Sequence, residues 1–382
     1  VAGFWAWNSV ATLGAFYTQD LALTPAATGL LVAMPVFVGS LGRIVVGTLT
    51  DKYGGRAMFT FVLVAAIPPI LLVSLGGLIS SFALVLGAGL LLGVAGTVFA
   101  VGIPFVSAWY EPARRGFATG VFGAGMGGTA LAAFLNPRLV AGIGYFPTHL
   151  LIAGVLAVMA ALVWFLMKES PGWAPNHAPV LPKLMDAART AVTWKMCFLY
   201  AVVFGGFVSF ATYLPTYLRD VYSFDPAGAG ARTAGFALAA VLARPVGGVL
   251  ADRLGPKPVV LVALGAVAVL GWVVNLRPDG EVPAGATIAM AAALGLGTGG
   301  VFAWVGVLSP AGKVGSITGI VSAAGGLGGY FPPLVMGATY DAVTRSYSIG
   351  LLLLVGTALV ALVFTLLAVQ PKAGTAAVQR AR

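Results

Sequence analysis

Two arginines, Arg43 and Arg244, lie inside long apolar stretches of the sequence. A guanidinium group keeps its positive charge at physiological pH, and its planar fork of N–H donors can bind two oxygens of one anion. A buried arginine normally pairs with a carboxylate. The eleven acidic residues, however, all fall at the ends of the apolar stretches or between them: Asp20, Asp51, Glu111, Glu169, Asp186, Asp220, Asp225, Asp252, Asp279, Glu281 and Asp341. The two arginines therefore indicate a binding site for a small anion. A purely structural role, with contacts to carbonyl groups or water, is the alternative.

The stretches that carry these arginines indicate a membrane protein. Hydrophobic residues make up 59% of the 382-residue chain and charged residues only 8%, and the mean hydropathy is +1.00. Soluble domains carry about a quarter charged residues. The apolar runs last about twenty residues, the length of a transmembrane helix, and lack the alternation of barrel strands. We therefore expect an all-α polytopic membrane protein.

The apolar runs predict twelve transmembrane helices in two bundles. Their approximate positions are 2–19, 27–50, 57–79, 82–109, 116–138, 146–167, 195–219, 229–252, 257–275, 284–308, 315–338 and 347–369. The connections are short except for the Pro-rich stretch 168–194, which we interpret as a linker. This divides the chain into a bundle over 1–167, the linker, a bundle over 195–369 and a tail over 370–382. The chain starts at Val1 without Met, which suggests that N-terminal residues are missing, and its first apolar run is not interpreted as a cleaved signal.

The basic residues predict the orientation of the chain. Of the 21 Lys and Arg residues, fourteen fall on the face that carries the linker and the tail, and five fall on the opposite face: Arg138, Arg219, Arg232, Arg277 and Arg345. Positive residues concentrate on the cytoplasmic side. We therefore expect a multi-pass protein of the inner cell membrane with both termini in the cytoplasm. The net charge of +10 is then explained by topology, and a nucleic-acid partner is not expected.

The sequence repeats itself across the two predicted bundles. Residues 43–56, RIVVGTLTDKYGGR, match residues 244–257, RPVGGVLADRLGPK, at an offset of 201. The tripeptide VFA recurs at 98–100 and 301–303, and a glycine-rich stretch recurs from Gly116 and from Gly315. Parallel repeats of six helices are the architecture of one large transporter fold, which works by alternating access around a site near the midplane. In such a fold the two arginines face each other, and planar oxyanions such as nitrate and nitrite suit bidentate donation.

Aromatic side chains are candidates for the walls of this site. Tyr200 and Phe204 are four residues apart in one predicted helix and share a face. Phe99 and Phe302 occupy equivalent positions in the two repeats. Flat rings could stack on a flat anion, and Tyr200 could donate a hydrogen bond. Packing in the core or against lipid is the alternative for each ring taken alone.

The pattern G-x-x-x-D-[RK]-x-G occurs twice, at 47–54 and at 248–255. It resembles the signature loop of the major facilitator superfamily, which implies a fold of twelve helices in two six-helix bundles. Glycine allows helices to approach closely, and Asp51 could meet a basic residue or a helix N-terminus. We expect this loop to close the cytoplasmic side. The candidate gate residues are Gly47, Asp51, Lys52, Arg56, Gly248, Asp252 and Arg253.

Two glycine-rich helices narrow the resemblance to one family. The stretches 319–337, GIVSAAGGLGGYFPPLVMG, and 120–137, GVFGAGMGGTALAAFLNP, are similar to the signatures of the nitrate/nitrite porter family. The resemblance implies that Arg43 and Arg244 clamp the substrate, with Tyr200, Phe204 and Phe99 around it. The family often has an asparagine where this chain has Met126. The signature glycines, which allow helices to pack closely, slide or bend, are Gly123, Gly125, Gly127, Gly128, Gly325, Gly326, Gly328 and Gly329.

These features favour exchange of nitrate for nitrite by a functional monomer in the lipid bilayer. Closing an empty carrier around two unpaired positive charges is costly, and a bound anion removes that cost. His149 near a span end and His177 in the linker offer no obvious proton carrier at depth. No cofactor or metal is expected, since Cys197 is the one cysteine, and no enzyme site is apparent. Proton-coupled symport is the first alternative, followed by a multidrug exporter or a nutrient sensor of the same fold.

Overall fold

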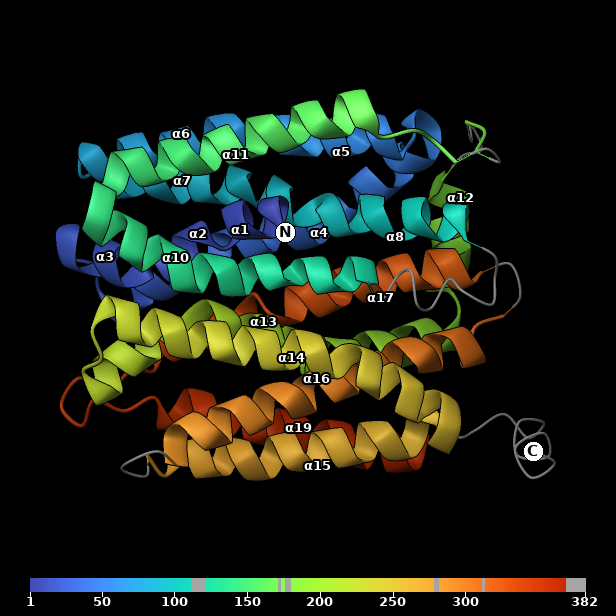
Figure 1. Cartoon of the computed structure of the whole chain (residues 1–382). Helices are drawn as coiled ribbons and strands as arrows, with labels where there is room; N and C mark the ends of the chain where they lie inside the picture. Colours follow the sequence, from blue (N-terminus) through green and yellow to red (C-terminus); the bar gives the residue numbers. More distant parts are fainter. Residues whose placement is uncertain (111–120, 171–172, 176–179, 278–281, 311–312, 369–382) are drawn as a thin grey trace.

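The computed structural model describes residues 1–110, 121–170, 173–175, 180–277, 282–310 and 313–368 (Figure 1). These residues form helices and short connections, with one isolated bridge between Asp341 and Ser346 as their only β pairing. The prediction of an all-α membrane protein is therefore confirmed. The predicted tail over 370–382 lies outside the described residues.

The N-terminal bundle is built from helices that correspond to the first six predicted spans. Their bounds are α1 (Ala2–Trp7), α2 (Ser9–Thr12) and α3 (Gly14–Asp20), then α4 (Pro25–Tyr53), α5 (Gly55–Ala65) with α6 (Ile67–Leu78), α7 (Phe82–Leu92) with η1 (Gly93–Thr97) and α8 (Val98–Trp109), η3 (Ala124–Gly127) with α10 (Gly128–Ile143), and α11 (Tyr145–Leu166).

The C-terminal bundle follows a short helix in the predicted linker, α12 (Val180–Ala188). The bundle consists of α13 (Ala191–Tyr222), α14 (Pro226–Leu254), α15 (Pro256–Asn275), α16 (Val282–Leu308), α17 (Val314–Gly328) with α18 (Phe331–Ala338), and α19 (Ser348–Ala368). In Figure 1 the N-terminal bundle, in blue and green, lies above the C-terminal bundle, in yellow and red.

Nine helical stretches of the described chain are long and apolar enough to cross a membrane. The described parts of the other three predicted spans, the first, fifth and eleventh, consist of shorter helical pieces. The first is interrupted at Asn8 and Leu13, where Asn136 of α10 accepts from Trp5 Nε1 at 2.7 Å and donates to Thr12 Oγ1 at 2.9 Å. The eleventh restarts at α18, whose first turn contains proline, a residue that suits a helix start. These interruptions place backbone and polar side chains inside the protein, where their hydrogen bonds are made internally.

The two bundles meet along their central helices, α4 and α10 on one side and α13, α14, α17 and α18 on the other. Helix α4 contacts α17 and α18, and α10 contacts α14. We call the end of the spans that carries Asp51 and α12 the linker end, and the opposite end the far end. At the far end, Arg219 of α13 donates to Ala15 O at 2.7 Å and to Gln19 Oε1 at 3.0 Å. The groups that could bind a substrate lie between these two ends, on the central helices.

Candidate functional site

Arg43 connects the two bundles near the middle of α4. Its side chain is only 4% exposed. Nη1 donates to the carbonyl oxygen of Ser322 at 3.3 Å and to Ser322 Oγ at 3.4 Å, while Nε is buried without a partner among the described residues. Ser322 belongs to α17, the glycine-rich helix of the opposite bundle. The guanidinium group of Arg43 therefore forms its hydrogen bonds with one serine of the other bundle.

Arg244 lies in α14 and has fewer polar contacts. Its Nη1 lies 2.6 Å from the thioether sulfur of Met126, a fully buried residue of η3, and sulfur is a weak acceptor. Its Nε and Nη2 atoms are both buried and have no hydrogen-bond partner in the part of the chain that the structure describes. The Nε–H and an Nη–H of a guanidinium form a two-donor fork that matches two oxygens of an anion. Arg244 therefore presents unused donors inside the protein.

Phe204 of α13 brings the two arginines to one place. The guanidinium carbon of Arg43 lies 5.5 Å from the centre of this ring, and that of Arg244 lies 5.0 Å from it. Both distances are within the range of cation–π attraction, about 6 Å. Among the residues that the structure describes, neither arginine forms an ion pair with an acidic side chain. Two positive charges from opposite bundles thus share one aromatic wall and lack a counter-charge.

The other predicted aromatic residues surround this pair. Tyr200 stacks on Phe204 with ring centres 4.9 Å apart, and Phe302 contacts Tyr200 edge-on at 4.6 Å. Phe99 of α8 lies 5.7 Å from the guanidinium carbon of Arg43. The sequence interpretation missed Phe207, whose ring centre is 4.8 Å from the guanidinium carbon of Arg244. Its position three residues after Phe204 on the same helix is the signal that could have revealed it.

The glycines of the α17 signature allow close packing around the site. A Cβ on Gly325 would collide with Tyr200, and one on Gly328 would collide with Ala201 of α13. A Cβ on Gly326 would collide with Ser40 of α4, and one on Gly329 would collide with Val208 of α13. Helix α17 therefore packs closely against α13 of its own bundle at three of these glycines, and against α4 of the opposite bundle at Gly326.

The glycines of the other signature differ among themselves. Gly128 packs against Val1 and Phe4, and a Cβ on Gly125 would lie 3.4 Å from the backbone nitrogen of Val1. Gly123 and Gly127 have nothing within 4 Å of a Cβ position. Close packing explains Gly128 but not these two.

The predicted gate residues lie at the linker end. Asp51 and Lys52 are exposed at the end of α4, as are Asp252 and Arg253 at the end of α14. A Cβ on Gly47 would lie 3.8 Å from Ala100, an ordinary contact, and Gly248 has open space around it. Their function as a gate remains a prediction.

Glu169, which was placed in the linker, contacts the first gate loop. Its carboxylate accepts from the backbone nitrogens of Gly55 at 3.2 Å and Arg56 at 2.7 Å, at the N-terminus of α5. A carboxylate stabilises this positive end of a helix. Gly54 has a φ of +87°, which favours glycine, and a side chain there would meet Glu169. The Arg56 guanidinium carbon stacks 4.5 Å from the ring centre of Trp164. The linker is thus attached to the N-terminal bundle where it begins.

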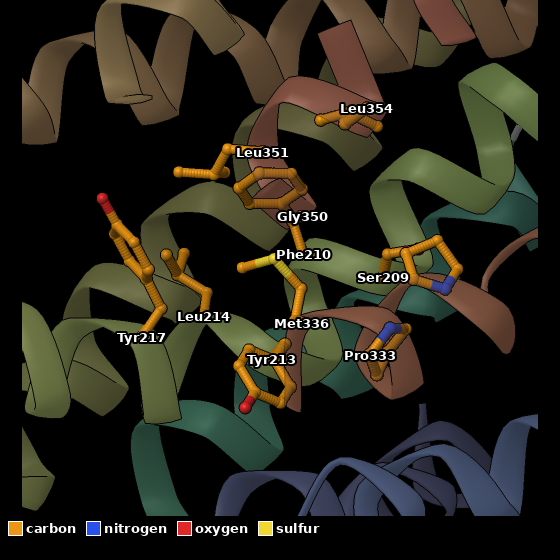
Figure 2. Close-up of a pocket in the computed structure, with 11 residues that line it drawn as sticks. Ser209, Phe210, Tyr213, Leu214, Tyr217, Pro333, Met336, Gly350, Leu351 and Leu354 are labelled. Atoms are coloured by element: carbon orange, nitrogen blue, oxygen red, sulfur yellow. The ribbon is translucent and has the colours of Figure 1, made fainter. Parts of the chain in front are cut away.

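A small, partly open pocket lies apart from the arginines (Figure 2). It is enclosed by α13, α18 and α19, and its lining includes Phe210, Tyr213, Leu214, Met336 and Leu351. The lining contains no charged residue. This apolar pocket does not suit a small anion.

Comparison with known proteins identifies a transporter, not an enzyme. A family model described as Major Facilitator Superfamily matches residues 1–305 and 222–381. A crystal structure of a bacterial homolog to the human lysosomal transporter Spinster, in an inward-facing and occupied conformation, superposes with a TM-score of 0.71. It covers 96% of this chain and 94% of that chain at 16% identity, which supports the fold alone.

Sequence relatives identify the family within this class. The chain is 58% identical over 368 residues to the "Probable nitrate/nitrite transporter NarK2" of Mycobacterium tuberculosis (strain ATCC 25618 / H37Rv), covering 96% of this chain and 93% of that protein. It is 34% identical to the "Nitrite extrusion protein" of Bacillus subtilis (strain 168), covering 96% and 91%. It is 31% identical to the "Probable nitrate/nitrite antiporter NarK1" of Thermus thermophilus, covering 87% and 81%. The chain belongs to the nitrate/nitrite porter family of the major facilitator superfamily.

Proposed function

We propose that this protein exchanges nitrate for nitrite across the inner cell membrane, with Arg43 and Arg244 clamping the anion. The observation that carries the proposal is the unpaired state of Arg244. Two of its nitrogens are buried without partners beside a ring that Arg43 also faces. Each unsatisfied buried donor costs about 1–3 kcal/mol. A flat anion with oxygens at its edges relieves that cost and supplies the missing negative charge.

The same geometry explains how the anion is held between the bundles. Ser322 of α17 occupies one donor of Arg43, and Met126 occupies one donor of Arg244. These neutral groups compensate the guanidinium charges only weakly, so an anion that enters takes over the donors from both. Phe204 and Tyr200 provide a flat wall for a planar substrate. Nitrate and nitrite are planar oxyanions of this kind, and relatives bear names that refer to them.

Exchange follows from the charge of the empty site. An empty carrier would have to bury two unpaired cations while it changes conformation, and an uncompensated buried charge costs several kcal/mol. A loaded carrier avoids this penalty. The binding site therefore moves rapidly from one side of the membrane to the other only when an anion is bound. We further propose that the linker end is cytoplasmic, in agreement with the excess of basic residues there, and that a monomer is sufficient for transport.

Purified protein in liposomes tests this function. Vesicles loaded with nitrite are placed in labelled nitrate, with and without a pH gradient across the membrane. We expect rapid nitrate uptake that depends on internal anion, falls at least about tenfold in vesicles without it, and is insensitive to the pH gradient. Uptake that persists without internal anion and follows the proton gradient would instead establish proton-coupled symport. Vesicles prepared without protein are the control.

A further inference from the structure

The two bundles lie apart on the linker side of the anion site. Four glycines are three or four residues closer to the linker end than a residue of the site and share its helix face: Gly47, Gly123, Gly248 and Gly319. Among the described residues, a Cβ on Gly47 would meet only Ala100 of its own bundle, and the other three positions have nothing within 4 Å. Described atoms of the opposite bundle therefore do not reach these faces.

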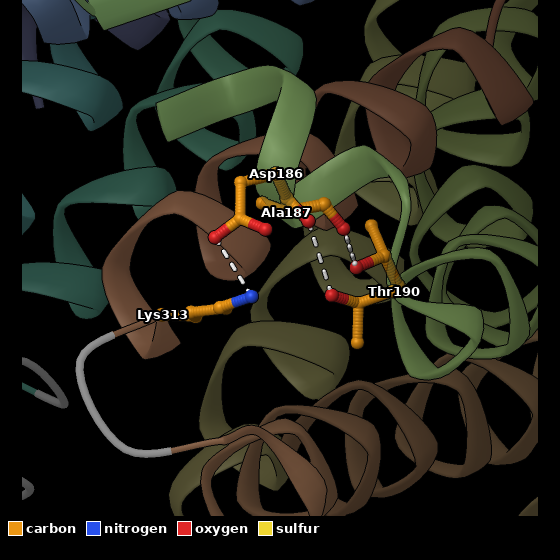
Figure 3. Close-up of polar contacts among 5 residues, drawn as sticks. Asp186, Ala187, Thr190 and Lys313 are labelled. Carbon is orange, nitrogen blue, oxygen red and sulfur yellow. Dashed lines mark hydrogen bonds and ion pairs between the residues drawn. The ribbon is translucent and has the colours of Figure 1, made fainter. Parts of the chain in front are cut away.

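The polar contacts of α12 at the linker end are made with the C-terminal bundle (Figure 3). Asp186 Oδ2 forms an ion pair of 2.7 Å with Lys313 Nζ at the start of α17. Thr193 Oγ1 of α13 donates to Ala187 O at 2.6 Å. These contacts attach α12 to one bundle and do not join the two bundles to each other.

The far end differs, because the two bundles touch there at backbone distance. A Cβ on Gly29, near the start of α4, would lie 2.5 Å from the carbonyl oxygen of Pro333 in α18. A Cβ on Gly337 of α18 would collide with the carbonyl oxygen of Pro25 in α4. The first turns of α4 and the helix α18 thus leave no room for a side chain between them. The far side of the site is therefore the closed one.

Arg219 adds a polar contact between the bundles at the same end. It lies in the last turn of α13, where Nη1 donates to Ala15 O at 2.7 Å and Nη2 donates to Gln19 Oε1 at 3.0 Å. Both acceptors belong to α3 of the opposite bundle. Hydrogen bonds from a charged donor are stronger than those between neutral groups. One turn earlier, the buried Thr216 has its Oγ1 3.6 Å from a Cβ position on Gly14 of α3.

We propose that Arg219 is a latch that holds the far end closed while the site is open toward the linker end. The inference rests on the proposed function, because it assigns a role in the transport cycle. Arg219 is fifteen residues from Phe204, about 22 Å along α13, so it is a positioning residue that does not touch the anion. Exposure of the site at the far end requires α13 to move away from α3. Arg219 must then release both acceptors.

Labelling of single cysteines by a charged maleimide, with the protein in lipid nanodiscs, tests the latch without measuring transport. The native cysteine is removed by Cys197→Ala, and Thr216→Cys then reports opening of the far end. We expect slow labelling that becomes about two- to tenfold faster when Arg219→Gln is added, because loss of the latch raises the fraction of carriers open at the far end. Gly319→Cys, on the open side, is expected to react faster than Thr216→Cys in otherwise unsubstituted protein.

Arg277→Gln is the matched control. Arg277 is also an arginine of the far end that donates to backbone carbonyls, those of Thr344 and Arg345, but these belong to its own bundle. It is expected to leave the labelling of Thr216→Cys unchanged. The buried Cys197, kept in Arg219→Gln without an added cysteine, reports folding and is expected to remain unlabelled.

Gln19→Glu is expected to shift the balance in the opposite direction. A carboxylate of the same length can accept from Arg219 Nη2 with a full negative charge, which strengthens the contact. Because Gln19 is exposed, solvent limits the gain, and labelling of Thr216→Cys should slow by about twofold. The slowing should disappear when Arg219→Gln is also present, since the partner is then missing.

Nitrate exchange at the far side gives a second readout. The apparent affinity at one side depends on the fraction of carriers open to it, so Arg219→Gln is expected to lower the half-saturating nitrate concentration there by about two- to tenfold. A merely damaged carrier would lose maximal rate without this decrease. Unchanged labelling of Thr216→Cys in Arg219→Gln, or an equal acceleration in Arg277→Gln, would overturn the latch. If unsubstituted protein still exchanges nitrate in those cases, the proposed function stands. If it carries no nitrate, the proposed function fails, while the labelling result still decides whether Arg219 holds the far end closed.

Discussion

Arg244→Lys is expected to lower nitrate exchange at low substrate concentration by about ten- to a hundredfold. Lysine keeps the positive charge, so attraction of an anion to the site remains. It loses the two-donor edge formed by Nε and Nη2, the nitrogens that lack partners in the structure. A hydrogen bond to a charged group contributes about 1.5–3 kcal/mol, which corresponds to this loss in rate. Arg43→Lys is expected to act in the same direction, because Nε of Arg43 is also unpaired.

Initial rates of exchange in nitrite-loaded liposomes measure this effect. Arg232→Lys is the matched control, because Arg232 belongs to the same helix but is exposed and donates to Gly228 O of its own helix. It is expected to retain the unsubstituted rate. Equal rates in Arg244→Lys and Arg232→Lys would show that charge alone is sufficient and would remove the argument for bidentate binding.

Gly326→Val is expected to lower the maximal exchange rate at least about tenfold. Gly326 of α17 faces Ser40 of α4, and a Cβ would lie 2.8 Å from Ser40 Cβ and closer still to its hydroxyl. Ser40 is buried, and its Oγ donates to Val36 O at 2.6 Å, so it cannot move aside without losing that bond. The extra methyl groups must therefore push apart the two helices that carry Arg43 and Ser322. Overpacking of this kind costs about 1–3 kcal/mol.

Gly319→Val on the same helix is the control, because a Cβ there meets nothing within 4 Å. It is expected to leave the exchange rate close to that of the unsubstituted protein. Adding Ser40→Gly to Gly326→Val makes room and is expected to recover part of the lost rate. No recovery, or an equal loss in Gly319→Val, would mean that close approach of α4 and α17 is not what the glycine provides.

The sequence allowed the class of fold and the pair of arginines to be predicted. Composition and the length of the apolar runs required membrane helices, and the offset of 201 residues between Arg43 and Arg244 implied repeated halves. Phe204 and Tyr200 were found because residues four apart share a helix face. These signals are local or periodic, so they can be recognised in a single sequence.

Contacts between segments far apart in the chain could not be predicted. Ser322 and Met126 touch the arginines from the opposite bundle; both lie in the glycine-rich signature stretches, but those stretches do not say which arginine each residue meets. The break at Asn8 depends on the same long-range effect, because Asn136, 128 positions further along the chain, organises the polar groups around it. The attachment of Glu169 to α5 was missed because a charged residue in a Pro-rich stretch resembles an ordinary linker residue.

A high-resolution structure of the nitrate-bound protein tests the central claim most directly. One planar anion is expected beside Phe204, with its oxygens within about 3 Å of guanidinium nitrogens of both Arg43 and Arg244. Arg43 should then have exchanged Ser322 for the anion, and Nε and Nη2 of Arg244 should be paired. Nitrate bound elsewhere, with Arg43 still donating to Ser322 and the same two nitrogens of Arg244 still unpaired, would contradict it.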